Sequence, residues 1–340
     1  MPVTIKQIAK IAQVSRGTVD KVLHNRPGLS DAVRDRVMQV INELQYQPNQ
    51  LAKSLSQSAI KRTLGVIVIA PDGSPFAQQI KNGIEAIKNE MRDFGFEILL
   101  HEMREFDAEE QAEIIRRLID DKVDGIAVMA LQSASITEAV KCANGHSIPV
   151  VSFVSDLEGC ERLCFVGQDL PKGARIAAEL LAKAVGKRGG IAILHGPRNM
   201  NAHVQRIECF KQVLARDYPD IAIMECLETR DLDELSYRQA KKVLSDPELA
   251  GIYLTGAGIG GVAKALCESN RRDVSLVCFD LTPVSIEYLH RGIIDFIIEQ
   301  DAFEEGYLSV KVLAEYLLSK EQPEKDKIYT NCSICIKENT

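Results

Sequence analysis

From Thr63 to the C-terminus, short runs of β-branched residues alternate with longer amphipathic segments. The strands that this pattern predicts are Leu64–Ile69, Glu97–His101, Gly125–Met129, Pro149–Phe153, Ile191–Leu194, Ala222–Cys226, Ile252–Leu254, Ser275–Phe279 and Asp295–Glu299. The helices between them include Gln78–Phe94, Ala108–Asp120, Leu170–Val185, Asn201–Arg216 and Glu304–Leu318. Such alternation requires right-handed βαβ crossovers and parallel sheets, so the fold class is α/β. The stretch is longer than one open sheet usually needs, and we expect two similar lobes.

Ligands of open parallel sheets bind beyond the carboxyl ends of the strands, where the loops of several βα units meet. The segments that follow the expected strands are Pro71–Phe76, Phe153–Asp156, His195–Asn201, Thr255–Gly258, Phe279–Pro283 and Gln300–Asp301. We expect these loops to line one cleft.

The N-terminal residues follow a purely helical pattern. Thr4 is a suitable N-cap, and apolar residues follow at helical spacing from Ile5 to Ala12. Gln13-Val14 forms a turn, Ser15 caps a second helix, and Ser30 caps a third. The apolar stripe of the third helix consists of Val33, Val37, Ile41 and Leu44. Three short helices with so small a core predict a separate domain.

Charge is distributed unevenly along the chain. Residues 1–62 contain ten Lys/Arg and four acidic residues, so they carry +6 of a total net charge of −7, which leaves −13 on the remainder. A basic segment on an acidic body indicates a polyanionic partner that binds the basic segment alone.

The second helix has side chains suited to reading DNA. In a helix-turn-helix, the N-terminal end of this helix reaches base edges in the major groove, while hydroxyl and backbone N–H groups hold phosphates. Arg16 suits a bidentate contact with guanine. Gly17 has no side chain, so base reading falls to Arg16 and Lys21, and Thr18 can contact a phosphate or a thymine methyl group. Asp20 can accept a hydrogen bond from cytosine or pair with Arg16.

A second motif follows in the segment Tyr46-Gln-Pro-Asn-Gln-Leu-Ala-Lys-Ser-Leu55. Asn49 can cap a short helix, and the small Ala52 permits close approach of a second helix. Leu55 can wedge between base pairs in the minor groove and kink the duplex. The alternative is an ordinary interdomain linker.

Together these motifs resemble the headpiece and hinge of the lactose-repressor (LacI-type) family. The shared residues are Val3-Thr4-Ile5-Lys6, Ala9, Ala12, Val14-Ser15, Thr18-Val19, Val22-Leu23, Tyr46, Pro48-Asn49, Ala52 and Leu55. The resemblance implies a helix-turn-helix headpiece at 1–47, a hinge helix and linker at 48–62, and a two-lobed periplasmic-binding-protein-like core. Its lobes are expected at 63–168 with 301–323, and at 169–300 with 324–340.

The resemblance also implies a homodimer that binds a pseudo-palindromic operator in double-stranded DNA. The candidate DNA-binding residues are Thr4, Ser15, Arg16, Gly17, Thr18, Lys21, Asn25, Asn49, Ala52, Lys53 and Leu55. Asp20 departs from the small hydroxyl residue usual at its position, so its phosphate contact is in doubt.

In the core, the resemblance is to ribose-type binding proteins. Ser74-Pro75-Phe76 matches a polar residue and a stacking aromatic, and Arg206 matches a sugar-clamping arginine. Carboxylate, guanidinium and amide groups bind hydroxyl pairs, and aromatic faces stack on sugar rings. The candidate effector-binding residues are Asp72, Ser74, Phe76, Phe153, Ser155, Asp156, His203, Arg206, Thr255, Phe279, Asp280 and Gln300. Thr255-Gly256 and Val154-Ser155 depart from the expected Asn-Asp and Asp-Arg pairs. Any one of these residues can instead be a polar group that stabilises a loop.

Gly256-Ala-Gly-Ile-Gly-Gly261 matches the dinucleotide fingerprint, with Asp280 at the end of the next expected strand. Its place in the second lobe rather than in a first βαβ unit argues against a nicotinamide cofactor, and we expect none. The helix N-terminus there remains a candidate for a phosphate or carboxylate of the effector.

No catalytic set is recognisable, since the chain has no HExxH, no GxSxG and no cysteine with an evident base. His195 and His203 lie near the expected cleft and suit hydrogen bonds to a ligand. The nine cysteines are scattered, and Cys332-Ser-Ile-Cys335 lacks a second pair, so we expect free thiols and no metal. The chain has no long apolar run or signal peptide, which predicts a cytoplasmic protein that does not cross a membrane.

We therefore interpret the chain as a transcription regulator of the repressor type that senses a sugar or sugar derivative, and not as an enzyme. Two alternatives remain at this stage. One is a sensor that acts through protein contacts, and the other is a nicotinamide-dependent oxidoreductase.

Overall fold

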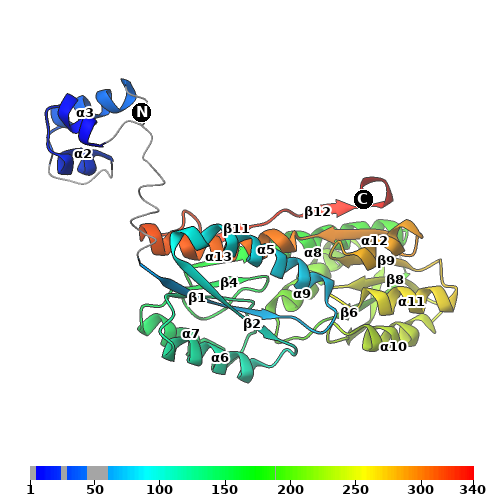
Figure 1. The fold of residues 1–340 in the computed structure, drawn as a ribbon. Helices are drawn as coiled ribbons and strands as arrows, with labels where there is room; N and C mark the ends of the chain where they lie inside the picture. The colour runs from blue at the N-terminus through cyan, green and yellow to red at the C-terminus, as the bar shows by residue number, and fades with distance from the viewer. Residues whose placement is uncertain (1–4, 24–28, 44–59, 188) are drawn as a thin grey trace. The chain divides into compact units, whose positions relative to one another are not determined.

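Figure 1 shows the computed structural model, which describes residues 5–23, 29–43, 60–187 and 189–340. The chain divides into two units, Met1–Ile60 and Lys61–Thr340, and each is described by itself. Several candidate DNA-binding residues lie outside the described residues, namely Thr4, Asn25, Asn49, Ala52, Lys53 and Leu55.

The first unit contains α1 (Ile5–Ile11), α2 (Arg16–Leu23) and α3 (Asp31–Glu43). Their small core consists of Ile8, Ala9, Ala12, Val19, Val22, Val37, Val40 and Ile41. Gln13 has a positive φ of 53° and forms the turn between α1 and α2. The backbone N–H of Thr18 donates to Ser15 Oγ at 3.0 Å, so the predicted cap of α2 is confirmed.

The second unit contains two six-stranded sheets (Figure 1). The first has the order β11-β5-β4-β3-β1-β2, and all its pairs are parallel. Its strands are β1 (Arg62–Ile69), β2 (Phe96–Met103), β3 (Gly125–Val128), β4 (Val150–Phe153), β5 (Cys164–Gly167) and β11 (Lys327–Tyr329).

The second sheet has the order β12-β10-β9-β8-β6-β7, and only β12 runs antiparallel to its neighbour. Its strands are β6 (Gly189–His195), β7 (Ile221–Glu228), β8 (Leu249–Leu254), β9 (Ser275–Phe279), β10 (Phe296–Glu299) and β12 (Ser333–Cys335). The predicted two-lobed α/β core is confirmed.

Helices pack in pairs against these sheets. In the first lobe α5 (Pro75–Met91) packs on α13 (Ala302–Ser319), and α6 (Ala108–Asp120) packs on α7 (Ala134–Gly145). In Figure 1 the two pairs lie on opposite faces of the first sheet. In the second lobe α8 (Leu170–Ala184) packs on α9 (Asn201–Asp217), and α10 (Asp233–Leu244) packs on α11 (Ile259–Ser269). The remaining helices are η1 (Arg92–Phe94), α12 (Pro283–His290) and η2 (Lys337–Asn339).

The chain passes between the sheets at three crossover segments, which are 168–169 after β5, 300–301 after β10, and 330–332 after β11. The last of these differs from our expectation that 324–340 belongs to the second lobe, because β11 pairs with β5 of the first sheet. Only β12 joins the second sheet. β5, β11 and β12 are short strands that the sequence pattern did not predict.

Gly83 of α5 and Gly306 of α13 permit these two helices to touch backbone to backbone. A Cβ at Gly83 would collide with the carbonyl oxygen of Phe303 and lie 2.8 Å from the backbone nitrogen of Tyr307. A Cβ at Gly306 would collide with the carbonyl oxygen of Ile80. Backbone cannot yield as a flexible side chain does, so both positions require glycine.

We expect Gly83→Ala to destabilise the core by about 1–3 kcal/mol, the usual cost of overpacking. The measurement is thermal unfolding of the full chain. Gly145→Ala is the matched control, because Gly145 ends α7 and has nothing within 4 Å of its Cβ position. Equal melting temperatures for the two variants would contradict the close α5–α13 contact.

Candidate functional site

A cavity of about 260 Å³ lies between the two lobes of the second unit. Its walls are loops and helix starts that follow the carboxyl ends of strands in both sheets, as parallel topology predicts. The candidates from the sequence that line it are Asp72, Ser74, Phe76, His203, Arg206, Asp280 and Gln300. The structure thus gathers at one surface residues that are more than two hundred positions apart in the chain.

The wall from the first lobe is mainly apolar, with Phe76 and Phe106 among its lining residues. Ser74 is the N-cap of α5, and its Oγ accepts from the N–H of Ala77 at 3.2 Å. Asp72 forms an exposed ion pair with Arg104 at 3.3 Å. This wall therefore offers aromatic faces and few free polar groups.

Arg206 of α9 is 3% exposed and lines the cavity. One terminal nitrogen, NH1, donates to the carbonyl oxygen of Thr255 at 2.7 Å. The other, NH2, donates to Oε1 of Gln168 at 2.9 Å and of Gln300 at 2.7 Å. The guanidinium carbon lies 3.7 Å from the ring centre of Phe279, and Nε has no hydrogen-bond partner. Three hydrogen bonds from its two terminal nitrogens hold Arg206 in place, and its Nε–H has no partner.

Asp280 directly follows β9, has a positive φ of 72° and accepts a hydrogen bond from Gln300. Burial raises the pKa of Asp280, although the Arg206 charge and the Gln300 hydrogen bond oppose the shift. Asp280 is one of the residues that line the cavity. Asp280 thus pairs with Arg206 through charge without a direct hydrogen bond between them in the structure.

His203 and Asp231 form a second polar pair on the wall from the second lobe. His203 Nε2 lies 3.2 Å from Asp231 Oδ2, and His203 Nδ1 lies 3.0 Å from the hydroxyl of Thr255. The other Asp231 oxygen, Oδ1, is buried and has no hydrogen-bond partner. A buried carboxylate oxygen without a partner costs free energy, so this site favours a ligand that brings a donor.

Glu305 of α13 lies behind Arg206, at the crossover segments. Its Oε1 accepts from the N–H of Gln168 at 3.0 Å and lies 3.5 Å from the hydroxyl of Thr330, while Oε2 has no partner. Burial raises the pKa of Glu305 well above its ordinary value, with Arg206 opposing the shift and Asp280 adding to it. The crossovers and the cavity wall therefore share one buried polar network.

Five predicted effector residues do not line the cavity. They are Phe153, Ser155, Asp156, Thr255 and Phe279. Phe153 and Phe279 are completely buried, and the ring of Phe279 packs against the guanidinium of Arg206. Ser155 Oγ accepts from the N–H of Ala202 at 3.2 Å, and Thr255 binds Arg206 and His203. These residues support the wall instead of forming it.

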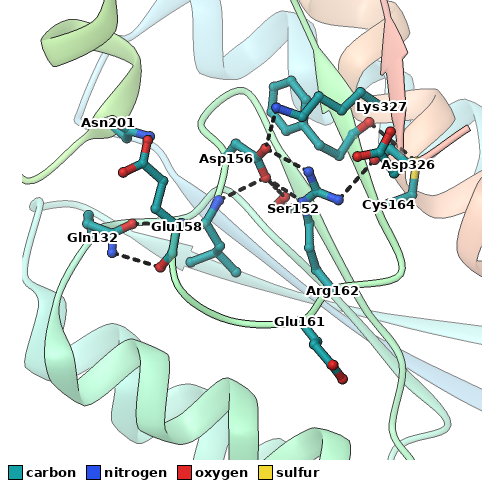
Figure 2. Close-up of polar contacts among 12 residues, drawn as sticks. Gln132, Ser152, Asp156, Glu158, Glu161, Arg162, Cys164, Asn201, Asp326 and Lys327 are labelled. Carbon is teal, nitrogen blue, oxygen red and sulfur yellow. Dashed lines mark hydrogen bonds and ion pairs between the residues drawn. The ribbon is translucent and has the colours of Figure 1, made fainter.

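Asp156 is the clearest difference from the sequence prediction. Figure 2 shows it in a polar cluster with Ser152, Arg162 and Lys327. The Arg162 guanidinium binds it through two nitrogens, at 2.5 and 2.7 Å. Although burial raises the pKa of Asp156, the Arg162 hydrogen bonds bring it below its ordinary value. The carboxylate is therefore bound by Arg162 within the β4–β5 loop and by Lys327 of β11, and it joins these two parts of the fold.

The glycine-rich segment 256–261 has a packing role. A Cβ at Gly258 would collide with Ser236, and one at Gly261 would lie 2.8 Å from the backbone nitrogen of Tyr237. These glycines let α11 begin directly against α10. The N–H of Gly261 donates to Asp233 Oδ1 at 3.2 Å, so a carboxylate of the protein already occupies this helix N-terminus.

Asp231, Asp233 and Phe106 also line the cavity, and our sequence reasoning missed them. The signal was available, because Asp231 and Asp233 follow β7 at its carboxyl end and Phe106 follows β2 in the same way. Both are edge strands of their sheets.

In the first unit, α2 presents a polar surface away from its core. Gly17 and Lys21, one turn apart, are exposed, and Thr18 is half-buried. Val19 and Val22 are buried on the opposite face. The Ser15 and Thr18 hydroxyls lie 2.9 Å apart at the start of the helix. This is the arrangement that a helix in the major groove requires.

Within residues 5–23, 29–43, 60–187 and 189–340, no group of His, Cys, Asp or Glu side chains is arranged to hold a metal ion. No helix in these ranges is long and apolar enough to span a membrane. The cysteines are free thiols, of which Cys142 is exposed, five are half-buried and Cys164, Cys278 and Cys335 are buried.

Comparisons with known proteins agree with both units. Residues 64–321 match the family model of the periplasmic binding protein domain, and residues 4–49 match that of bacterial regulatory proteins, lacI family. The HTH-type transcriptional regulator DegA of Bacillus subtilis is 29% identical over 72% of this chain and 70% of its own length. Catabolite control protein A of Staphylococcus epidermidis is 30% identical over 64% of this chain and 62% of its own. The ribose operon repressor of Halalkalibacterium halodurans is 26% identical over 93% and 91%.

Solved structures share the fold of the core. GanP, a glucose-galactose binding protein from Geobacillus stearothermophilus, has a TM-score of 0.75 at 23% identity, covering 82% of this chain and 99% of that one. A solute binding protein from Burkholderia graminis, in complex with D-arabinose, has a TM-score of 0.75 at 25% identity, covering 82% and 96%.

The fold and the comparisons define a helix-turn-helix protein with a two-lobed binding core. The chain belongs to the periplasmic binding protein domain family over residues 64–321 and carries a lacI-family domain at residues 4–49. It is similar to the transcriptional regulators named above.

The buried Glu305 carboxyl generates a pH prediction. Its folded pKa is raised by burial, so the folded state holds a proton that the unfolded chain releases above its own pKa of about 4.3. Stability from this group is therefore lost as pH rises from that value through the folded pKa.

We expect the stability of Glu305→Gln relative to the native chain to increase as the pH rises from 5 to 8. Each kcal/mol of this difference corresponds to about 2–4 °C in melting temperature. Thermal unfolding at several pH values measures this. Glu304→Gln, which alters the neighbouring half-buried residue, is the matched control. If the difference in melting temperature between Glu305→Gln and the native chain did not change with pH, a raised pKa of Glu305 in the folded state would be contradicted.

Proposed function

We propose that this chain is a repressor that binds a pseudo-palindromic operator as a homodimer. Its affinity for the operator falls or rises when a sugar or sugar derivative binds in the interlobe cavity. The observation that carries the proposal is the cavity itself, which places aromatic residues opposite a fixed arginine and two carboxylates. A DNA-reading helix in the same chain supports the regulatory role. Such a regulator acts in the cytoplasm, where DNA lies.

The DNA-binding proposal rests on the exposed face of α2. Lys21 and the backbone around Gly17 are accessible, and the whole segment 1–62 is basic. Arg16 is placed in the first turn of α2, where side chains reach base edges. A symmetric dimer would place two such helices at half-sites about one helical turn of DNA apart.

The effector proposal rests on chemistry that suits a polyhydroxylated ring. Phe76 and Phe106 offer faces for stacking, and the Arg206 Nε–H and Asp231 Oδ1 are unpaired polar groups beside the cavity. The related proteins named for ribose, glucose-galactose and D-arabinose support this ligand class.

The proposed mechanism is linkage between two binding equilibria. A ligand that contacts both lobes favours one arrangement of the lobes over another. Operator affinity then changes by the difference in ligand-binding free energy between the two arrangements. The crossover segments couple ligand binding to the arrangement of the lobes. Arg206 lines the cavity and also donates to Gln168 and Gln300, which lie in two of these segments.

We expect Arg16→Ala to relax base preference at one position of each half-site, at a cost of about 1–3 kcal/mol. Selection of binding sites from random duplex DNA, with native chain and variant side by side, measures the preference. Arg36→Ala removes one positive charge from the exposed side of α3 and serves as control, since a phosphate contact changes affinity without changing sequence preference. An unchanged selection profile for Arg16→Ala would contradict its role.

We expect at least one member of a panel of pentoses, hexoses, polyols and inositols to raise the melting temperature of the core. Arg206→Ala and Phe76→Ala should each abolish that shift, because they remove the hydrogen-bonding and the stacking group. Phe76 is half-buried, so its variant keeps the test meaningful if Arg206→Ala fails to fold. Phe303→Ala, outside the cavity and 41% exposed, is the control. Retained shifts in both cavity variants would place the effector elsewhere.

A further inference from the structure

The N-terminus of α11 faces the cavity, with Gly258, Ile259 and Gly260 among the lining residues. Free backbone N–H groups and the helix dipole make such an end attractive to a phosphate or carboxylate. Here Asp233 already fills the position. Its Oδ1 accepts from the N–H of Gly261 at 3.2 Å, and its Oδ2 would lie 2.8 Å from a Cβ at Gly260.

The other charges of the cavity wall do not favour an anion either. Asp72 is balanced by its exposed ion pair with Arg104. The other carboxylates of the wall belong to Asp231, Asp233 and Asp280, against the guanidinium of Arg206 and the imidazole of His203. Asp231 has a side chain that is 10% exposed, with one oxygen on His203 and the other without a partner. A second negative charge beside this buried carboxylate would be repelled in a medium that screens poorly.

Arg206 is also unable to act as an anion clamp. Phosphate and carboxylate groups are bound best by two parallel N–H groups of one guanidinium. Both terminal nitrogens of Arg206 are engaged by Thr255, Gln168 and Gln300, and one face is covered by Phe279. The unpaired Nε–H can serve one hydroxyl oxygen, which is a weaker and uncharged contact.

We propose that the cavity selects an uncharged or amine-bearing polyol and rejects phosphorylated and carboxylated ones, with Asp233 as the residue that determines this charge specificity. The inference rests on the proposed function, since it takes the cavity to be the effector site. A ligand of this class brings hydroxyl or ammonium donors to the Asp231 and Asp233 side of the cavity.

Inorganic phosphate tests the charge specificity without knowledge of the effector. The full chain contains no Trp, so dye-based thermal unfolding is the readout, with chloride at equal ionic strength as reference. Asp233→Asn keeps an oxygen for the Gly261 N–H but removes the negative charge. We expect it to bind phosphate about tenfold more tightly than the native chain.

Glu234→Gln is the matched control, because Glu234 is the next residue of α10, lies outside the cavity and makes only an exposed ion pair with Arg238 at 3.6 Å. Phosphate binding by the basic N-terminal segment is common to all three proteins and cancels in the comparison. Equal phosphate responses of native chain, Asp233→Asn and Glu234→Gln would overturn the proposal.

A second measurement separates this inference from the proposed function. Monosaccharides are compared with their phosphate esters and their 2-amino derivatives on the native chain. Binding of parents or amines in preference to phosphates supports the inference, and tighter binding of a phosphate ester overturns it. If no compound of any class binds while Asp233→Asn still gains phosphate affinity, the sugar-sensing proposal fails and the charge specificity stands.

Discussion

The buried guanidinium of Arg206 is the interaction on which the core depends. A charge that is 3% exposed must be satisfied by the protein, and its acceptors come from α8–β5 and β10–α13 crossovers and from the end of β8. Removing one partner of such a network typically costs about 3–5 kcal/mol, because it leaves a buried charge uncompensated. The same side chain lines the cavity. Cavity and crossovers are therefore parts of one polar network, which is the physical basis for coupling ligand binding to lobe arrangement.

The second constraint is close backbone approach at glycines. In the first lobe it brings α5 against α13, and in the second it brings α11 against α10. The second contact has a chemical consequence, because it places the first turn of α10 at the N-terminus of α11. Asp233 then neutralises a helix end that would otherwise attract an anion. The glycine-rich segment 256–261 resembles a phosphate-binding loop in sequence, but its packing against α10 places it beside Asp233 in an acidic part of the cavity wall.

Sequence reasoning succeeded where the signal was periodic or topological. The strands from β1 to β10 other than β5 were placed correctly because short apolar runs between amphipathic helices indicate buried strands. Phe76, Asp280 and Gln300 were placed at one surface because parallel strands end at the same edge of a sheet, and Arg206 was placed there by the resemblance to ribose-type binding proteins. Asp156 was misplaced because a lone acidic residue after a strand does not reveal its partner. Asp156 forms ion pairs with Arg162 and Lys327, which are six and 171 positions further along the chain.

By itself the sequence determined the helical headpiece, the two α/β lobes and the loops that meet between them. These follow from local periodicity, capping and chain topology, which are properties of contiguous segments. Only the tertiary structure decided which polar side chains remain available to a ligand. Asp233 is committed to α11, Ser74 to α5 and Asp156 to Arg162, whereas Asp231 Oδ1 and Arg206 Nε are left without partners. That division depends on which groups come within hydrogen-bonding distance after folding, and no local pattern encodes those long-range pairings.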